Sequence, residues 1–194
     1  MADIYNCSEK TDEQLVKLTL KNQDYFLCLM KRYEGKLLKY ILRISNMSYQ
    51  EGEDILQEIF IKIYRNLNDF DDKYKFSTWV YRIARNETIS HYRKSNSKDK
   101  DKVIDVEDDV FERISADLDI EKDLRNKEMR IVIKKALGKI NKKYREVITL
   151  RFLEDKDYEE ISYILKKPTG TIATWLNRAK KELRKELIKE NINL

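Results

Sequence analysis

Residues that interrupt helices are scarce in this sequence: it has one proline and four glycines among 194 residues. Average usage would give about 10 prolines and 14 glycines in a chain of this length. So few turn formers leave little room for a protein built from short strands. The sequence therefore predicts an all-α fold.

Cysteine and histidine are scarce as well. Cys7 and Cys28 belong to no CxxC motif or Cys/His cluster, and His91 is the only histidine. We therefore expect two unpaired thiols, as in a reducing cytoplasm, and no metal site. No nucleophile–base or carboxylate–histidine set can be assembled, and there is no GxxxxGK[ST] loop. The sequence predicts that the protein is not an enzyme and has no cofactor.

Long apolar runs are also missing. The longest, YFLCLM, has six residues, whereas a membrane-spanning helix needs roughly 20. The start, MADIYNCSEK, lacks the basic and then apolar pattern of a signal peptide. We expect a cytoplasmic protein without membrane insertion.

Charge divides the chain into three parts. The net charge is +3 over residues 1–98, −7 over residues 99–123 and +9 over residues 124–194, within a total of +5. The acidic part has few large apolar residues, so it cannot offset the entropy of ordering. It is either a solvated spacer or a mimic of nucleic acid that screens its basic flanks. We predict two small helical domains, 1–96 and 127–194, joined by a flexible acidic linker, 97–126.

The N-terminal domain is predicted to contain four helices with capped starts. The expected caps are Thr11 with Gln14, Asn22, Ser48 with Glu51, and Ser77 or Thr78. Apolar residues recur at helical spacing along each predicted helix. The main stripes are Phe26, Met30, Leu37, Ile41 and Ile44; Ile55, Ile59, Ile63 and Leu67; and Trp79, Ile83, Ile89 and Tyr92.

The C-terminal domain contains two amphipathic segments separated by KKPTG, a connection typical of a helix-turn-helix. In the first, Tyr158, Ile161, Ile164 and Leu165 share one face. The second has a single predicted buried stripe of Ile172, Leu176, Ala179, Leu183 and Leu187. Its opposite face carries Thr171, Thr174, Asn177, Arg178 and Lys181, side chains that can contact base edges and phosphates. An ordinary helical hairpin with a solvated face is the alternative, but the positive charge of this domain favours a polyanionic partner.

Three segments in this order resemble the sigma-70 family of RNA polymerase sigma factors, in its extracytoplasmic-function (ECF) type. EDILQEIFIKIYRNLNDFD resembles the core-polymerase-binding segment. FSTWVYRIARNETISHYRK resembles the segment that melts and reads the minus-ten element. LGKINKKYREVITLRFLEDKDYEEISYIL, with the proline turn, resembles the domain that reads the minus-thirty-five element.

The resemblance implies three sets of binding residues. The polymerase-binding set is Asp54, Gln57, Glu58 and Phe60. The minus-ten set is Tyr74, Phe76, Arg82, Arg85, Asn86, Arg93 and Lys94, with Tyr74 and Phe76 at a pocket for a flipped base. The minus-thirty-five set is Thr171, Thr174, Asn177, Arg178 and Lys181. Trp79 is expected in the core.

The C-terminal segment departs from the family pattern at four positions. Pro168 replaces a small capping residue, Thr169 stands where an aliphatic residue is common, and Ala173 and Trp175 lie on the reading face. These differences are compatible with the fold, but with them the DNA sequence preferred at the minus-thirty-five element need not be the one usual for the family. Trp175 either packs beside Ile172 and Ala179 or reaches a thymine methyl.

The resemblance implies a sigma factor that binds core polymerase and directs promoter-specific initiation, melting DNA without nucleotide hydrolysis. Its implied partners are promoter DNA, the clamp helices and flap of core RNA polymerase, and an anti-sigma factor. Two other hypotheses remain open: a stand-alone helix-turn-helix regulator that binds duplex DNA without polymerase, and a helical adaptor with no promoter-dependent effect.

Overall fold

The computed structural model describes residues 6–45, 47–95, 133 and 135–189, with the side chains of Lys94 and Ser95 excepted. The described residues form helices and connecting turns without any strand, which confirms the all-α prediction. The chain divides into two compact units, Met1–Ser97 and Lys98–Leu194. The predicted acidic linker, residues 97–126, lies outside the described residues. No helix in the described ranges is long and apolar enough to cross a membrane.

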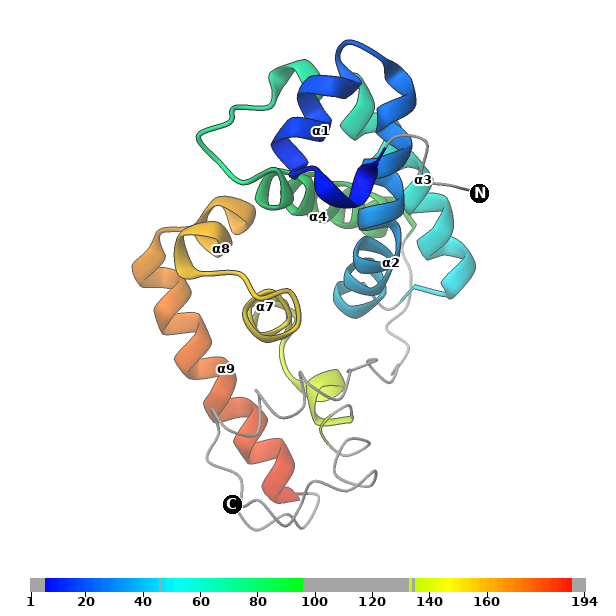
Figure 1. Ribbon diagram of the computed structural model, residues 1–194. Helices are drawn as coiled ribbons and strands as arrows, with labels where there is room; N and C mark the ends of the chain where they lie inside the picture. Colours follow the sequence, from blue (N-terminus) through cyan, green and yellow to red (C-terminus); the bar gives the residue numbers. More distant parts are fainter. Residues whose placement is uncertain (1–5, 46, 96–132, 134, 190–194) are drawn as a thin grey trace. The chain divides into compact units, whose positions relative to one another are not determined.

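The first unit begins with two short turns and two α-helices (Figure 1). These are η1 (Cys7–Glu9), α1 (Asp12–Thr19), η2 (Gln23–Tyr25) and α2 (Phe26–Ile44). The predicted capping box is present at α1, where Thr11 and Gln14 each bond the other's backbone. Asn22 caps the short turn η2 rather than the long helix, which begins after it at Phe26.

Two more helices complete this unit: α3 (Tyr49–Arg65) and α4 (Phe76–Ser95), with the short turn η3 (Leu67–Asp69) between them. The capping box of Ser48 and Glu51 is confirmed. The prediction of Ser77 or Thr78 as the cap of α4 is wrong. The Lys75 carbonyl accepts hydrogen bonds from the amides of Thr78 and Trp79, so the helix starts earlier and both residues lie inside it.

The core of the first unit lies where α2 and α4 pack against α3. The predicted α3 stripe is buried throughout: Ile55, Ile59, Ile63 and Leu67. On α4 the predicted face is partly wrong, because Ile83, Ile89 and Tyr92 are only half-buried. The buried side of α4 is formed instead by Phe76, Trp79, Val80, Tyr81, Ala84 and Thr88.

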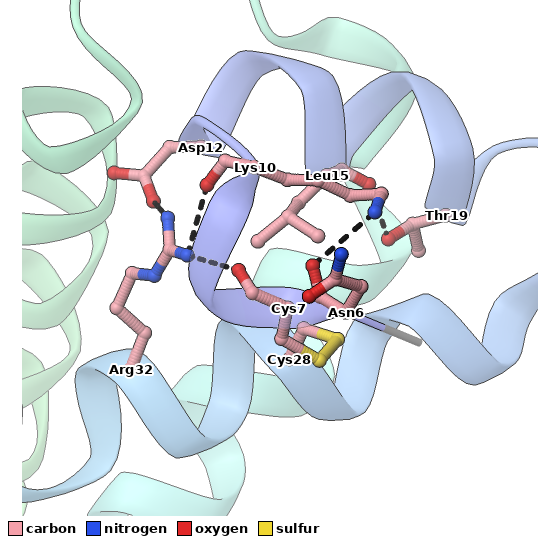
Figure 2. Close-up of a disulfide and its surroundings, with 8 residues drawn as sticks. All are labelled: Asn6, Cys7, Lys10, Asp12, Leu15, Thr19, Cys28 and Arg32. Carbon is pink, nitrogen blue, oxygen red and sulfur yellow. Dashed lines mark hydrogen bonds and ion pairs between the residues drawn. A yellow bond between two sulfur atoms is a disulfide. The ribbon is translucent and has the colours of Figure 1, made fainter. Parts of the chain in front are cut away.

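Cys7 and Cys28 form a disulfide, which corrects the expectation of two unpaired thiols (Figure 2). Their Cα atoms are 5.5 Å apart, although the residues are 21 positions apart in sequence. The pairing depends on η1 lying against the first turns of α2, a tertiary contact that the sequence spacing of the two cysteines does not reveal. Cys28 is buried, and Cys7 is half-buried.

The second unit contains a helix that ends at Lys139, followed by α7 (Lys142–Ile148), the π-helical turn η5 (Thr149–Leu153), α8 (Tyr158–Leu165) and α9 (Thr169–Lys189). The buried Arg145 caps the helix that ends at Lys139. Its guanidinium donates hydrogen bonds to the carbonyls of Leu137 and Gly138 in the last turn of that helix. Both α7 and α8 pack against α9. Within the described residues, α7 and α8 thus support the long helix along its buried side.

Candidate functional site

The turn between α8 and α9 is fixed by backbone and hydroxyl hydrogen bonds. Lys166 ends α8 in the left-handed conformation, at φ 51°. Across this turn the Lys167 amide donates to the Ser162 carbonyl, and the Ser162 hydroxyl donates to the Lys167 carbonyl. The Pro168 carbonyl then accepts from Thr171 and Ile172, so the proline stands immediately before α9, where its missing N–H costs nothing.

The two faces of α9 differ as the sequence predicts. Five residues are at most 3% exposed: Ile172, Leu176, Ala179, Leu183 and Leu187. On the opposite face Thr174, Asn177, Arg178 and Lys181 are exposed, while Thr171 is half-buried. The Thr174 hydroxyl donates to the Gly170 carbonyl at 2.9 Å, which leaves its oxygen as an acceptor and its methyl group as an apolar contact.

Two aromatic residues of the second unit, Trp175 and Tyr158, are not fully buried in its core. Trp175 is half-buried at the edge of the α9 stripe, with the Lys143 ammonium 5.9 Å from its ring centroid. Tyr158 is 42% exposed, which corrects its predicted place on the inner face of α8. As the first residue of that helix it lies outside the core, beneath the Arg151 guanidinium at 5.8 Å.

The outward surface of α3 combines charge with an apolar groove. Asp54, Gln57 and Glu58 are exposed, but Phe60 is only 6% exposed and packs edge-to-face against Phe26 at 6.3 Å. The groove has a volume of about 420 Å³. Its lining consists of Phe26, Met30, Glu34, Leu56, Gln57, Phe60, Ile61, Tyr64 and Arg65.

The sequence pattern did not identify Ile61 as a surface residue. It is 52% exposed, next to Tyr64 at 43%. Its position outside the buried stripe of Ile55, Ile59 and Ile63 was the feature of the sequence that could have indicated this exposure. Phe60, in contrast, contributes its ring to the floor of the groove rather than to the exposed rim. We call the surface of Asp54, Gln57, Glu58 and this groove the α3 surface.

The predicted minus-ten residues differ in how far their side chains are exposed. Tyr74 is 44% exposed in the loop before α4, and Arg93 is exposed near the end of that helix. Arg82, Arg85 and Asn86 are half-buried, and their i, i+3 and i+4 spacing places them on one side of α4. The Lys94 side chain is outside the described part of the chain.

Phe76 does not lie on this surface, which corrects its predicted place at a base pocket. It is 1% exposed, because its ring packs against Tyr33, Phe70 and Trp79 at 5.7, 5.3 and 5.7 Å. Trp79 is 9% exposed, in agreement with its predicted core role. We therefore omit Phe76 from the candidate DNA surface and assign it to the support of the loop that carries Tyr74.

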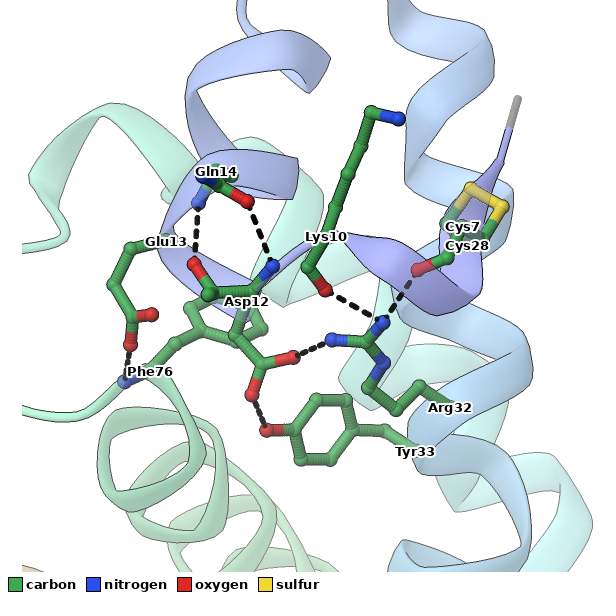
Figure 3. A network of polar contacts seen from close by, with 10 residues as sticks. Cys7, Lys10, Asp12, Glu13, Gln14, Cys28, Arg32, Tyr33 and Phe76 are labelled. Carbon is green, nitrogen blue, oxygen red and sulfur yellow. Dashed lines mark hydrogen bonds and ion pairs between the residues drawn. A yellow bond between two sulfur atoms is a disulfide. The ribbon is translucent and has the colours of Figure 1, made fainter.

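A polar network with no signal in the sequence pattern joins α1 to α2 and α4 (Figure 3). The Asp12 carboxylate accepts from the Arg32 guanidinium at 2.6 Å and from the Tyr33 hydroxyl. Burial, followed by the hydrogen bond to Asp12, raises the pKa of Tyr33 far above its ordinary value. The Glu13 carboxylate accepts from the amide of Phe76 at 3.4 Å. The network thus ties the start of α1 to the start of α4.

Among the described residues, no group of three His, Cys, Asp or Glu side chains could hold a metal ion. His91 is half-buried on α4, and its Nδ1 has no hydrogen-bond partner there. The candidate binding residues lie on the α3 surface, on one side of α4 with the loop before it, and on the polar face of α9.

Both units match established families. Residues 29–98 match sigma-70 region 2, and residues 130–183 match sigma-70 region 4. These two segments include α3 and α4 of the first unit and α7, α8 and most of α9 of the second.

The chain is similar over nearly its whole length to known sigma factors. It is 35% identical over 187 residues to the ECF RNA polymerase sigma factor SigW of Bacillus subtilis, which covers 90% of this chain and 98% of the relative. It is 31% identical to the RNA polymerase sigma-H factor of Pseudomonas aeruginosa, with 93% and 95% covered, and 32% identical to the ECF RNA polymerase sigma-E factor of Escherichia coli K12, with 89% and 92% covered.

Solved structures share the fold at lower identity. CnrH in complex with the cytosolic domain of CnrY has a TM-score of 0.65 at 22% identity and covers 93% of this chain and 99% of that one. RpoE in complex with the anti-sigma factor NepR from Bartonella quintana has a TM-score of 0.62 at 23% identity, with 84% and 96% covered. Together with the region 2 and region 4 matches and the relatives above 30% identity, these findings show that the chain belongs to the sigma-70 family of RNA polymerase sigma factors, in its ECF branch.

Proposed function

We propose that this protein binds core RNA polymerase and directs it to particular promoters, acting in the cytoplasm as an initiation factor rather than as an enzyme. The observation that carries the proposal is the presence of both DNA-reading regions of the family in one chain. In the second of these regions, α9 is supported on one side and polar on the other. No nucleotide hydrolysis is required, because trapping of unstacked bases supplies the melting energy.

The polar face of α9 is proposed to read the minus-thirty-five element. Thr171, Thr174 and Asn177 lie in its N-terminal half, where a recognition helix contacts base edges. Arg178 and Lys181 follow on the same face and are proposed to bind phosphates. Because the Thr174 hydroxyl hydrogen is directed to Gly170, we expect Thr174 to contribute an acceptor or a methyl contact.

The minus-ten element is proposed to meet α4 and the loop before it. The exposed ring of Tyr74 offers a stacking surface for an unpaired base. Arg82, Arg85 and Asn86 line one side of α4, and Arg93 with Lys94 extends the positive charge toward its end. This combination suits a strand with displaced phosphates and unstacked bases.

The α3 surface is proposed to dock on the clamp helices of the largest polymerase subunit. Its apolar groove offers Phe60, Ile61 and Tyr64 to a partner side chain, while Asp54 and Glu58 stand beside it as exposed carboxylates. Apolar contact at the centre with charged residues at the rim is the usual composition of a protein interface. A basic partner helix would complement these carboxylates.

We further propose that residues 1–96 and 127–194 act as separate domains, with residues 97–126 as an acidic tether between them. Such a tether would let the second domain bind the polymerase flap and the minus-thirty-five element once the first is docked, because the second contact becomes intramolecular. An anti-sigma factor is a further proposed partner, since related structures contain such complexes: RpoE is bound there to the anti-sigma factor NepR.

Reconstituted transcription tests the proposal. Purified protein is added to core polymerase with a library of promoter templates, and start sites are mapped. We expect defined start sites that are absent with core polymerase alone. The stand-alone regulator hypothesis predicts duplex binding by the protein but no initiation by the mixture, and the adaptor hypothesis predicts neither.

A double substitution tests the docking surface. Asp54→Lys with Glu58→Lys should abolish binding to core polymerase while circular dichroism stays unchanged. The matched control is Glu9→Lys with Asp72→Lys, which changes the net charge equally at exposed positions outside the groove and outside the segment that resembles the polymerase-binding one. Normal binding by the first variant, or equal loss in both, would show that the docking surface lies elsewhere.

A further inference from the structure

The N-terminal segment is attached to α2 by two residues one helical turn apart. Cys28 binds Cys7 through the disulfide. Arg32 donates to the carbonyls of Cys7 and Lys10, at 2.7 and 2.9 Å, and to the Asp12 carboxylate at 2.6 Å (Figure 2). The covalent and polar contacts therefore hold the same short segment, and each limits the motion that would break the other.

The attachment continues from this segment to α4. Asp12, at the start of α1, accepts a hydrogen bond from the Tyr33 hydroxyl, and the Tyr33 ring packs edge-to-face against Phe76 at 5.7 Å. Glu13 accepts from the Phe76 amide at 3.4 Å (Figure 3). Glu13 thus contacts the first residue of α4 directly, and Asp12 bonds the tyrosine whose ring packs against it.

Phe76 is also the end of the loop that carries Tyr74. Residues 71–75 connect Phe70 to Phe76, and the rings of these two phenylalanines are in contact at 5.3 Å. Both ends of the loop therefore rest on one aromatic cluster, completed by Trp79. Greater mobility of Phe76 is therefore expected to increase the mobility of the loop and of the exposed Tyr74 ring.

We propose that Cys7 and Cys28 are a thiol–disulfide site that controls how firmly this loop is held. In the disulfide form, the N-terminal segment is fixed on α2, and the contacts of Asp12 and Glu13 support Phe76. In the dithiol form, only the contacts of Arg32 and the packing of Leu15 and Val16 hold this part of the chain, so α1 separates from α2 more often and the loop loses support. The effect on minus-ten reading rests on the proposed function, whereas the effect on the loop does not.

The redox step needs a thiol of low molecular weight, such as glutathione, and its disulfide. In reduction, the thiolate attacks the half-buried Cys7 sulfur, and the electron pair of the Cys7–Cys28 bond passes to Cys28, which takes up a proton. A second thiol attacks the mixed disulfide and releases Cys7 as a thiol. In total, two molecules of the small thiol are oxidised to one small-molecule disulfide, and the protein disulfide is reduced to two cysteine thiols. Oxidation of the protein is the reverse of these steps.

Hydrogen exchange of the full chain, without polymerase or DNA, tests the proposal. The oxidised protein is compared with protein reduced by dithiothreitol. We expect amides of residues 7–19 to exchange on the order of a hundredfold faster after reduction, since a closed loop no longer limits their opening. Amides of residues 71–78 should also exchange faster, and those of α9 should not change.

Cys7→Ser is the matched control, because it keeps the size of the side chain but forms no disulfide. It should exchange like the reduced protein at residues 7–19 and 71–78 and should not respond to dithiothreitol. Faster exchange confined to residues 7–12 would overturn the link to the loop. Equal exchange in oxidised and reduced protein would overturn the role of the cysteine pair.

Mass spectrometry after incubation with glutathione disulfide checks the chemistry. The expected product is the intramolecular disulfide, seen as a loss of two hydrogens without bound glutathione. Stable glutathione adducts on both cysteines would refute the pairing. These readouts are independent of promoter binding, so failed initiation with intact redox-dependent exchange would count against the proposed function alone.

Discussion

Reduction of the Cys7–Cys28 bond should lower the stability of the first unit by about 3 kcal/mol. The cysteines are 21 positions apart, and this figure follows from the denatured-chain entropy removed by closing a loop of that length. For a unit of the size of Met1–Ser97, each kcal/mol shifts Tm by about 4–8 °C. Reduction is therefore expected to lower the Tm of this unit by roughly 12–24 °C.

The assay must separate the two units, because a chain with two cores need not unfold in one step. The chain has two tryptophans, one in each unit. Trp79 is 9% exposed and lies against Phe70 and Phe76, so its fluorescence reports the first unit. The half-buried Trp175 is replaced in a Trp175→Phe background, which leaves Trp79 as the only reporter.

Thermal unfolding is then followed with and without dithiothreitol. A shift below about 3 °C between the two forms would refute the loop-closure reasoning, since it corresponds to less than about 1 kcal/mol. Cys7→Ser in the same background should unfold with the reduced protein. Unfolding far below the reduced protein would indicate that packing of the Cys7 sulfur, rather than the cross-link, supplies the stability.

Three further predictions concern binding and pH. Arg178→Ala and Lys181→Ala should each weaken duplex binding and reduce the salt slope by about 1 per lost phosphate contact; a slope unchanged relative to Lys36→Ala, an exposed control outside the DNA surfaces, would exclude contact with the backbone. Glu58→Lys alone should weaken core-polymerase binding, measured by fluorescence anisotropy, and Glu58→Gln should weaken it less if charge is the cause; equal effects would contradict that. The pKa of Tyr33 is raised above its unfolded value of 10.0, so its contribution to stability is complete below that pH and is lost as the pH rises above it. Chemical unfolding above about pH 10 should therefore show a steeper loss in the wild type than in Tyr33→Phe, by at most about 1.4 kcal/mol per pH unit, and parallel curves would refute the assignment.

Local periodicity was enough to predict the faces of α9 and α3. The five-residue stripe from Ile172 to Leu187 and the stripe from Ile55 to Leu67 are buried because large aliphatic residues repeat at the helical period. On α4 this signal failed. Its core side contains small residues, Ala84 and Thr88, whose weak hydrophobicity is easily passed over in favour of larger neighbours.

Contacts between distant residues were not predictable in the same way. Phe76 follows a polar loop, and its burial depends on the Tyr33 ring from another helix. The disulfide likewise depends on the path of the chain between η1 and α2. Neither feature leaves a periodic pattern. An aromatic residue next to a loop and two widely spaced cysteines are compatible with several arrangements until the helices are packed.

The outward faces of α3 and α9 fit different kinds of partner. Outside its stripe, α9 carries polar and cationic groups, such as Asn177 and Arg178, which can exchange hydrogen bonds with water for bonds to bases and phosphates. The α3 surface keeps Ile61 and Tyr64 half-exposed beside carboxylates. Carboxylates are repelled by the negative charge of a phosphate backbone. Exposed apolar area is unfavourable in water, and its burial against a protein partner lowers the free energy. Both helices share one amphipathic design, and the different residues outside their stripes favour the roles proposed above, DNA binding for α9 and polymerase binding for α3.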